Sequence, residues 1–132
     1  MAGHTIQIRV RHHEMDALGH VNNAVYLNYA EECAIDHGEK VGFGIARMRE
    51  LGGIFVVRRH EITYHHPAVA GDELAVTTLV TAMAGVRATR RTTIAKTADG
   101  KLVADAQTDW VWVGNEGRPR RIPEEVLAAF PA

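Results

Sequence analysis

Hydrophobic and polar residues alternate strictly over residues 5–11, which predicts a β-strand with one buried face. The pattern changes over residues 22–38, where apolar positions recur every three or four residues, as on one face of a helix. This face comprises Tyr26, Tyr29, Ala30, Cys33, Ala34 and His37. Asn22 is a favourable N-cap because its side-chain oxygen can accept an unpaired backbone N–H, and Gly38 or Gly42 can end the helix.

Strand patterns dominate the rest of the chain. Runs rich in β-branched and aromatic residues occupy residues 54–64, 73–83, 86–97 and 102–113. The pair Asp99-Gly100 favours a hairpin between the last two runs. In the final run one predicted face carries Leu102, Ala104, Ala106, Thr108, Trp110 and Trp112, and the other carries Asp105, Gln107 and Asp109. Short helical segments are predicted over residues 44–51 and 124–130.

This order of elements predicts a single α+β domain over residues 1–132, with no linker or repeat. We expect an antiparallel, meandering sheet of five long strands, curved enough to wrap around the long helix. Such a sheet leaves long edges, so a homo-oligomer is expected to cover one of them.

Composition removes several classes of function. Fifteen Lys and Arg balance 16 Asp and Glu, which argues against sequence-independent binding of nucleic acid. No apolar run approaches the ~20 residues of a membrane-spanning helix, so no membrane partner is expected. The single cysteine, Cys33, excludes an internal disulfide and fits a reducing compartment, and with no secretory signal at the N-terminus a cytoplasmic location is predicted.

The loop ahead of the long helix is the best candidate for chemistry. It places Glu14, Asp16 and His20 before a helix N-terminus, where unpaired backbone N–H groups can bind an oxyanion. A carboxylate there could attack a carbonyl or activate a water while an N–H group stabilises the developing charge. On spacing alone, an Asp in this position is more often the acceptor of a local turn.

Three motifs in this chain resemble those of the 4-hydroxybenzoyl-CoA thioesterase family, whose fold is the hotdog. Residues 14–26, EMDALGHVNNAVY, are similar to its D-x-x-G-H-V-N-N-x-x-Y signature. Residues 62–74 resemble its Y-x-x-P-A and G-D-x-L elements, and residues 118–123 resemble its C-terminal R-P-R-x-I-P element. The resemblance implies a five-stranded antiparallel sheet wrapped around one long central helix, with homodimers that often pair again into homotetramers.

The resemblance further implies hydrolysis of an acyl-CoA thioester. It assigns Asp16 as nucleophile or general base and the backbone N–H of Asn23 as oxyanion donor. His20 and Asn22 would shape the loop or position water, and Tyr26 would line the acyl pocket or pack in the core. Coenzyme A is then part of the substrate, so no separate cofactor is expected, and acyl carrier protein is the alternative thiol carrier.

The expected binding residues come from the loop, the helix start and the strands. In the motif they are Gly19, Val21, Asn22 and Tyr26. From the strands of a second subunit they are Val56, Arg58 and His60, and for the phosphates of coenzyme A they are Arg87, Arg90 and Arg91. Arg90 and Arg91 must face opposite sides of a strand, so at most one of them joins Arg87 or Arg58 on a given surface.

Other interpretations remain beside this one. Eight histidines suggest a metal, but neighbouring histidines in a strand point to opposite faces and no spacing converges on one ion, so no metal site is expected. Cys33 lies among small apolar residues and is a poor nucleophile. A non-catalytic acyl-CoA binding module and, less favoured, a hotdog enoyl-CoA hydratase are the competing functions. The acyl group is not specified by any linear pattern.

Overall fold

The computed structural model describes residues 3–130, which form one antiparallel sheet and three α-helices. The strands are β1 (His4–Arg9), β2 (Gly53–Tyr64), β3 (Glu73–Ala84), β4 (Arg87–Lys96) and β5 (Leu102–Gly114). The helices are α1 (Val25–Lys40), α2 (Ile45–Glu50) and α3 (Glu124–Ala129), and a 3₁₀ turn, η1 (His12–Glu14), precedes α1. These bounds agree with the predicted elements to within a few residues.

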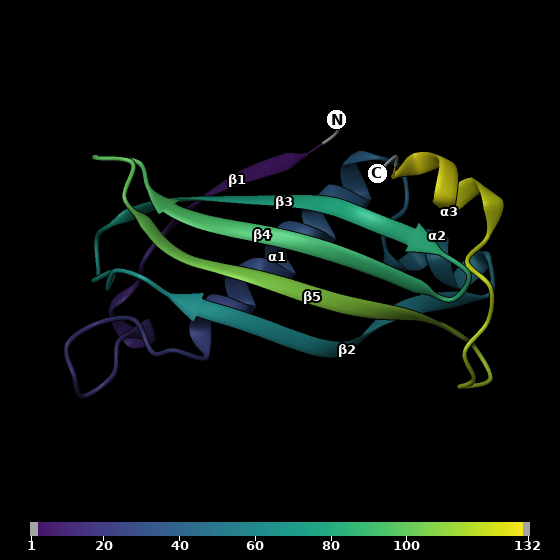
Figure 1. The fold of residues 1–132 in the computed structure, drawn as a ribbon, viewed down its shortest axis with the longest axis horizontal. Coiled ribbons are helices and arrows are strands. Elements are labelled where there is room, and N and C mark those ends of the chain that lie inside the picture. Colours follow the sequence, from purple (N-terminus) through teal and green to yellow (C-terminus); the bar gives the residue numbers. More distant parts are fainter. Residues whose placement is uncertain (1–2, 131–132) are drawn as a thin grey trace.

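The strand order in the sheet is β1-β3-β4-β5-β2. The predicted meander is therefore correct for β3, β4 and β5 only, because β2 pairs with β5 rather than with β3 (Figure 1). Residues 65–72 connect β2 to β3 from one side of the sheet to the other. A connection of this length is too long for a tight hairpin turn and frees its two strands to pair elsewhere.

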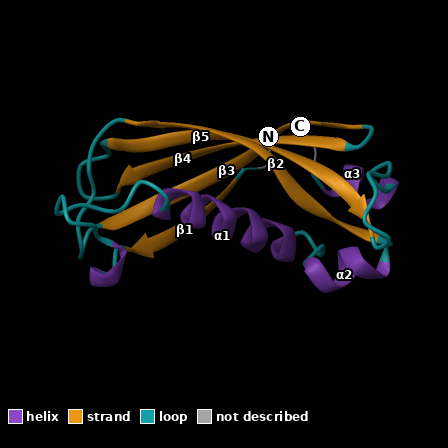
Figure 2. Ribbon diagram, turned by 90° about the horizontal axis from the view of Figure 1, so that it is seen from below, coloured by secondary structure: helices purple, strands orange, loops and turns teal. Residues whose placement is uncertain are grey.

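Helix α1 lies along one face of the sheet and buries the predicted face, with Cys33 fully enclosed (Figure 2). The helix begins later than predicted, with Ala24 rather than Asn22 at the N-cap position, and the Asn22 side chain accepts a hydrogen bond from the Ala24 N–H at 2.9 Å in the turn that leads into it. The helix runs past Gly38 and ends before Gly42, whose positive φ of 91° suits a glycine at a helix C-terminus. No helix within the described residues is long and apolar enough to cross a membrane.

The core has two parts. Beneath the first part of α1, Tyr26, Tyr29 and Cys33 pack against Leu74, Val76 and Ile94 of the sheet. At the other end of the sheet, Trp112 of β5 packs with Val126 and Phe130 from the C-terminal segment. The alternation predicted for β5 holds from Ala104 to Trp112, where Ala104, Ala106, Thr108 and Trp112 are buried and Trp110 is half-buried. It fails at the start of the strand, where the register against β4 is irregular and Val103 rather than Leu102 is fully buried.

A β-bulge at Arg58 changes how β2 presents its side chains. Val57 is opposite Trp110 and Arg59 is opposite Asp109, so Arg58 is the extra residue. An extra residue shifts the alternation by one, and Val56 and His60 therefore lie on opposite faces of the sheet. The three residues expected to reach the second subunit's site, Val56, Arg58 and His60, therefore do not lie on one face of the sheet.

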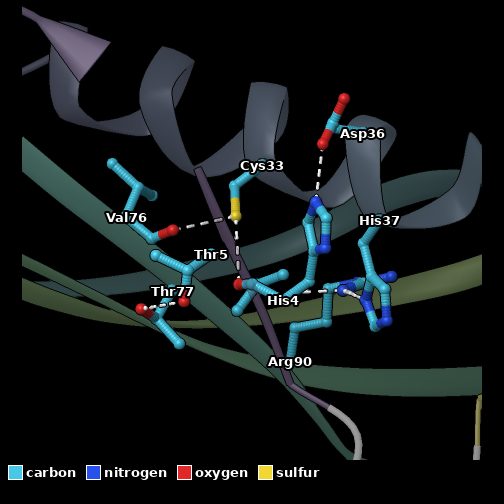
Figure 3. A network of polar contacts seen from close by, with 9 residues as sticks. His4, Thr5, Cys33, Asp36, His37, Val76, Thr77 and Arg90 are labelled. Carbon is cyan, nitrogen blue, oxygen red and sulfur yellow. Dashed lines mark hydrogen bonds and ion pairs between the residues drawn. The ribbon is translucent and has the colours of Figure 1, made fainter. Parts of the chain in front are cut away.

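A polar cluster joins β1, β4 and the end of α1 (Figure 3). The rings of His4 and His37 are stacked with centroids 5.2 Å apart, and His4 also contacts the Asp36 carboxylate at 2.6 Å. Nη1 of Arg90 donates to Nδ1 of His37 at 3.0 Å. Burial first, and then the charges of Arg90 and His4, lower the pKa of His37 to about 4. His37 is therefore neutral at physiological pH.

This depressed pKa makes stability depend on pH. Between pH 6.5 and pH 4 the unfolded chain binds a proton that folded His37 excludes, so the free energy of unfolding falls as the pH drops through this window. Across the whole window, His37 lowers the free energy of unfolding by about 3 kcal/mol. His37→Gln keeps an acceptor for Arg90 but does not titrate. The free energy of unfolding is measured by urea titration at several pH values in this window. It is expected to fall less steeply with decreasing pH in the variant than in wild type, and an equal fall in both proteins would contradict the role of His37.

Candidate functional site

The loop between β1 and α1 is anchored by a buried carboxylate, Glu14. It accepts hydrogen bonds from the backbone and side chain of Arg11 at 2.9 and 3.0 Å and from the Tyr29 hydroxyl at 2.9 Å. Burial raises the pKa of Glu14, but these hydrogen bonds outweigh it and the net pKa is lowered. Glu14 stays ionised and ties the loop both to β1 and to α1.

Asp16 occupies a tight turn within this loop. Its backbone N–H donates to the carbonyl of His20 at 2.9 Å, and Gly19 provides the positive φ of 84° that the turn requires. Oδ1 of Asp16 accepts a hydrogen bond from the Leu18 N–H at 2.9 Å, which is the local-turn role considered above. Within residues 3–130 no group donates a hydrogen bond to Oδ2. One carboxylate oxygen therefore holds the turn and the other is free to react.

His20 is beside Asp16 but is not paired with it. Nδ1 of His20 donates to the carbonyl of Val21 at 3.0 Å, whereas its distance to Oδ1 of Asp16 is 3.9 Å. That separation is too long for a hydrogen bond. The imidazole is fixed by the backbone with Nε2 left as an acceptor, so the geometry favours positioning of water or substrate over an Asp–His relay.

The start of α1 presents an unpaired backbone donor. The Val25 N–H bonds to the carbonyl of Asn22, and the Ala24 N–H bonds to the Asn22 side chain. The N–H of Asn23, between these residues, has no acceptor in the part of the chain that the structure describes. The first N–H groups of a helix favour negative charge, so this one is suited to an oxyanion.

Tyr64, at the end of β2, holds the same peptide from its other side. Its hydroxyl donates to the carbonyl of Asn23 at 2.9 Å, and its ring packs against the ring of Tyr26 with centroids 5.7 Å apart. The Asn23 carbonyl lacks the usual intrahelical donor, because the Leu27 N–H bonds to Ala24 instead. Tyr64 thus satisfies this carbonyl and fixes the direction of the first turn.

These groups surround a cavity of about 270 Å³. Its walls are formed by His20, Asn23, Tyr26, Tyr64, His65, His66 and Pro67. Asp16 is not part of this wall, but its carboxylate lies next to His20, and its side chain is 23% exposed. Asn23 therefore lines the cavity directly, and the partly exposed carboxylate of Asp16 adjoins the cavity wall at His20.

Removal of the Tyr64 hydroxyl is expected to slow turnover. Tyr64→Phe keeps the ring but releases the Asn23 carbonyl, and the loss of one hydrogen bond of about 1 kcal/mol corresponds to a fall in kcat of about fivefold. KM is expected to change little, because the hydroxyl orients a donor that acts on the transition state. Arg59→Gln, on the opposite face of the same strand, is the matched control. A larger effect on KM than on kcat would contradict this role.

The other expected loop residues are placed differently. Val21 is fully buried, donates its N–H to the carbonyl of Ala68 at 2.8 Å, and belongs to the core rather than to the cavity wall. Gly19 lies in the turn and also does not line the cavity. Tyr26 is buried in the core, as one of the two alternatives expected, and it also lines the cavity.

The three arginines proposed for the nucleotide do not form one cluster. Arg87 and Arg91 are exposed on the outer face of β4, and Arg91 is paired with Asp105 at 3.2 Å. Arg90 points to the inner face and is buried. Arg90 and Arg91 therefore face opposite sides of the strand, as predicted. At most two of these side chains are available to phosphate on a common surface.

Four cavity residues were not assigned a role in the site on the basis of the sequence. Tyr64, His65, His66 and Pro67 follow β2, and their signal was the Y-x-x-P-A motif that was used only as a mark of resemblance. The two histidines bond to different partners, Asp105 at 2.7 Å and the carbonyl of Leu102 at 2.9 Å. Within residues 3–130 no three His, Cys, Asp or Glu side chains are grouped to hold a metal ion.

Cys33 is buried in the core, where its thiol donates to the carbonyl of Val76 at 3.2 Å. Burial raises the pKa of this thiol to about 11. The thiol is therefore protonated at neutral pH and is unsuited to nucleophilic attack.

Comparison with known proteins connects this site to a family. The sequence pattern of the thioesterase-like superfamily matches residues 10–130. Long-chain acyl-CoA thioesterase FadM of Escherichia coli is 34% identical over 107 residues, covering 81% of this chain and 80% of that protein. Acyl-acyl carrier protein thioesterase ATL2, a chloroplastic protein of Arabidopsis thaliana, is 29% identical over 127 residues, covering 96% of this chain and 68% of that protein.

The structure gives the same result. A thioesterase from Thermus thermophilus, solved in complex with coenzyme A and Zn, superposes with a TM-score of 0.84 at 28% identity, covering 96% of this chain and 90% of that one. Its fold, like the arched antiparallel sheet and long helix described here, is that of hotdog thioesterases. The chain therefore belongs to the thioesterase-like superfamily of thioester hydrolases with the hotdog fold.

Proposed function

We propose that this chain hydrolyses acyl thioesters with Asp16 as the reacting carboxylate and the Asn23 N–H as the oxyanion donor. The observation that carries the proposal is the unpaired N–H of Asn23, a residue that lines the cavity next to the loop that holds Asp16. A donor at the start of α1 stabilises the negative oxygen that develops on a thioester carbonyl. The two groups together supply the requirements of acyl transfer.

Two routes are open to the carboxylate. As a nucleophile, Asp16 bonds to the carbonyl carbon, the C–S bond breaks, the thiolate leaves and is protonated, and water then hydrolyses the mixed anhydride. As a general base, Asp16 takes a proton from water as the water oxygen attacks, and that proton passes to the departing thiolate. Both routes place the carbonyl oxygen on the Asn23 N–H.

The substrate is an acyl group carried by coenzyme A or by acyl carrier protein. FadM acts on long-chain acyl-CoA and ATL2 acts on acyl-acyl carrier protein, so the relatives support both carriers. The bound coenzyme A in the Thermus thermophilus thioesterase supports the first. Arg87 and Arg91, exposed on the outer face of β4, remain the candidates for its phosphates.

The functional unit that we propose is a homodimer or a dimer of dimers. Strand β2 is an edge of the sheet, and Val56 on it is 43% exposed, so a second copy would cover both an unpaired edge and apolar surface. Val56, Arg58 and His60 are then available to the second subunit's site. Sedimentation of the purified protein tests this assembly. We place the enzyme in the cytoplasm, where its single buried thiol is stable.

The decisive experiment is thiol release from a panel of thioesters. Benzoyl, short aliphatic and long aliphatic groups on coenzyme A, and the same groups on acyl carrier protein, are supplied to the wild type. Turnover of one group identifies the substrate class and the carrier together. Binding of acyl-CoA without release from any thioester would contradict the proposal and favour a binding module, and hydration of an enoyl-CoA without thiol release would favour a hydratase.

A further inference from the structure

A second cavity of about 70 Å³ lies at the other end of α1 from the Asp16 loop. It is enclosed by the second half of α1, by α2 and by the inner face of the sheet. Most of its walls are apolar, and they include Ala34, Ile35, Phe43, Ile45, Met48, Phe55, Met83 and Phe130. Ile45, more than half exposed, stands at the opening. An apolar cavity with few polar groups is the usual form of a site for a small organic ligand.

The one charged group in this wall is the guanidinium of Arg90, and its side chain is only 9% exposed. Nη1 donates to Nδ1 of His37 at 3.0 Å and to the hydroxyl of Thr78 at 3.2 Å, as the His37 contact in Figure 3 shows. The guanidinium carbon lies 5.3 Å from the centre of the Phe130 ring. All of these partners are neutral.

No carboxylate pairs with Arg90 in the part of the chain that the structure describes. Burial lowers the pKa of Arg90 to about 10, so the group remains a cation at neutral pH. A buried charge without an opposite charge is strongly unfavourable in a folded protein. An anion that enters the cavity would remove this penalty.

A second polar group in the wall has no hydrogen bond at all. Of the buried side-chain nitrogen and oxygen atoms in residues 3–130, one has no hydrogen bond, and it is the indole Nε1 of Trp110. Trp110 lines the same cavity as Arg90. Buried polar groups in folded proteins are nearly always paired, so an unpaired N–H and a cation without an opposite charge in one wall indicate that an acceptor is missing.

We propose that this cavity binds the carboxylate end of an apolar chain, with the carboxylate on the guanidinium of Arg90. A single guanidinium binds a carboxylate through two parallel hydrogen bonds, whereas a phosphate ester would bring more negative charge than one cation offsets. The carboxylate can belong to a free acid or to the far end of an acyl group held as a thioester. The second source rests on the proposed function, and the first does not.

Direct binding tests the site without any turnover. Octanoate and 1-octanol have similar chains and differ in the charged end, and each is titrated into the protein while the amide signals of Gly38 and Gly44 are followed by NMR. Wild type is expected to bind octanoate about tenfold more tightly than the alcohol, since a hydrogen bond to a charged group contributes about 1.5–3 kcal/mol. In Arg90→Met the two affinities are expected to be equal. Equal affinities in wild type, or an unchanged preference in Arg90→Met, would overturn the proposal.

Further variants separate binding from folding. Arg90→Lys retains the cation and is expected to keep part of the preference, and Trp110→Phe is expected to weaken octanoate binding several-fold without affecting the alcohol. Arg47→Met removes an exposed guanidinium from α2 and serves as the control. Arg90→Met removes an uncompensated charge, so without ligand it is expected to melt no lower than wild type. Loss of the preference in Arg47→Met as well would contradict the site.

Turnover distinguishes the two sources of the carboxylate. From Asn23 to His37, the partner of Arg90, the chain advances fourteen residues along α1, roughly 21 Å, so a long acyl group is needed to span both sites. If the far end of the acyl group binds here, hexadecanedioyl-CoA is hydrolysed with a higher kcat/KM than hexadecanoyl-CoA, and Arg90→Met removes this difference. If the ligand is a free acid, both thioesters are hydrolysed alike while octanoate still binds through Arg90. Failure of the proposed function appears instead as no release from any thioester and leaves the binding measurement unaffected.

Discussion

Asp16→Asn is expected to lower the rate of thioester hydrolysis by about 10²–10⁴-fold without changing the fold. Asparagine keeps the side-chain oxygen that accepts the Leu18 N–H, so the turn is preserved. It lacks the negative oxygen that attacks the carbonyl or takes a proton from water. The substitution therefore separates the two roles of this side chain, the local turn and the chemistry.

The chain offers a matched control for this variant. Asp99, in the hairpin between β4 and β5, makes the same kind of turn, with Oδ1 accepting from the Lys101 N–H at 3.0 Å. Asp99→Asn is expected to leave hydrolysis unchanged. Rates are measured as thiol release under saturating and limiting substrate, and binding of a non-hydrolysable acyl-CoA analogue is measured in parallel. If Asp16→Asn keeps half of the wild-type rate, Asp16 has only the structural role in the turn and no role in the chemistry.

Isotope labelling of the wild type divides the two chemical routes. In a single turnover in heavy-oxygen water, a mixed anhydride that water opens at the Asp16 carbon leaves the label in Asp16 and gives the unlabelled carboxylate oxygen to the product. In the general-base route the water oxygen enters the product acid directly, and Asp16 stays unlabelled. Mass analysis of the peptide that contains Asp16 reports which route operates.

Asn23→Pro is expected to lower kcat by about 10²–10³-fold, the usual consequence of removing one oxyanion donor. Proline has no backbone N–H, and it is tolerated where a helix begins, because the first N–H groups have no intrahelical acceptor. Asn23 lies two residues before α1 begins at Val25, and its N–H has no acceptor in the described residues, so proline there breaks no existing hydrogen bond. KM is expected to change little, because the charge on the carbonyl oxygen develops in the transition state.

Asn23→Ala is the control for the side chain, because it keeps the N–H and should retain most of the activity. Circular dichroism and thermal unfolding establish that the proline variant has the wild-type helix content. Equal losses in both variants would move the role from the backbone to the Asn23 side chain. If Asn23→Pro retains the wild-type activity, the Asn23 N–H is not the oxyanion donor.

The cavity beside Asn23 shows what each kind of information contributes. The motif around Asp16, Asn22 and Asn23 marks the loop and the helix start in the sequence, and the structure contributes the unpaired N–H on which the proposed mechanism depends. Tyr64 is visible in the sequence only as part of a motif. Its contact with the Asn23 carbonyl joins residues 41 positions apart and follows from the pairing of β2 with β5.

The strands show the same division. Alternation correctly predicted the buried face of β5 from Ala104 to Trp112 and the opposite directions of Arg90 and Arg91. It does not reveal that Val56 and His60 lie on opposite faces of β2, because the bulge at Arg58 adds one residue that the amino-acid pattern does not mark. Alternation also could not predict the strand order, since β1 and β2 could each have paired with several other strands.

The sequence by itself determined the elements of this protein, the loop that carries Asp16 and the superfamily to which the chain belongs. These depend on local spacing, on turn and capping residues, and on contiguous motifs, all of which a linear chain displays. Only the tertiary structure decided that Tyr64 meets Asn23 and that Arg90, 53 positions from His37, is buried without an anion. Such contacts depend on which strands pair and which face α1 covers, and packing of the whole chain selects these.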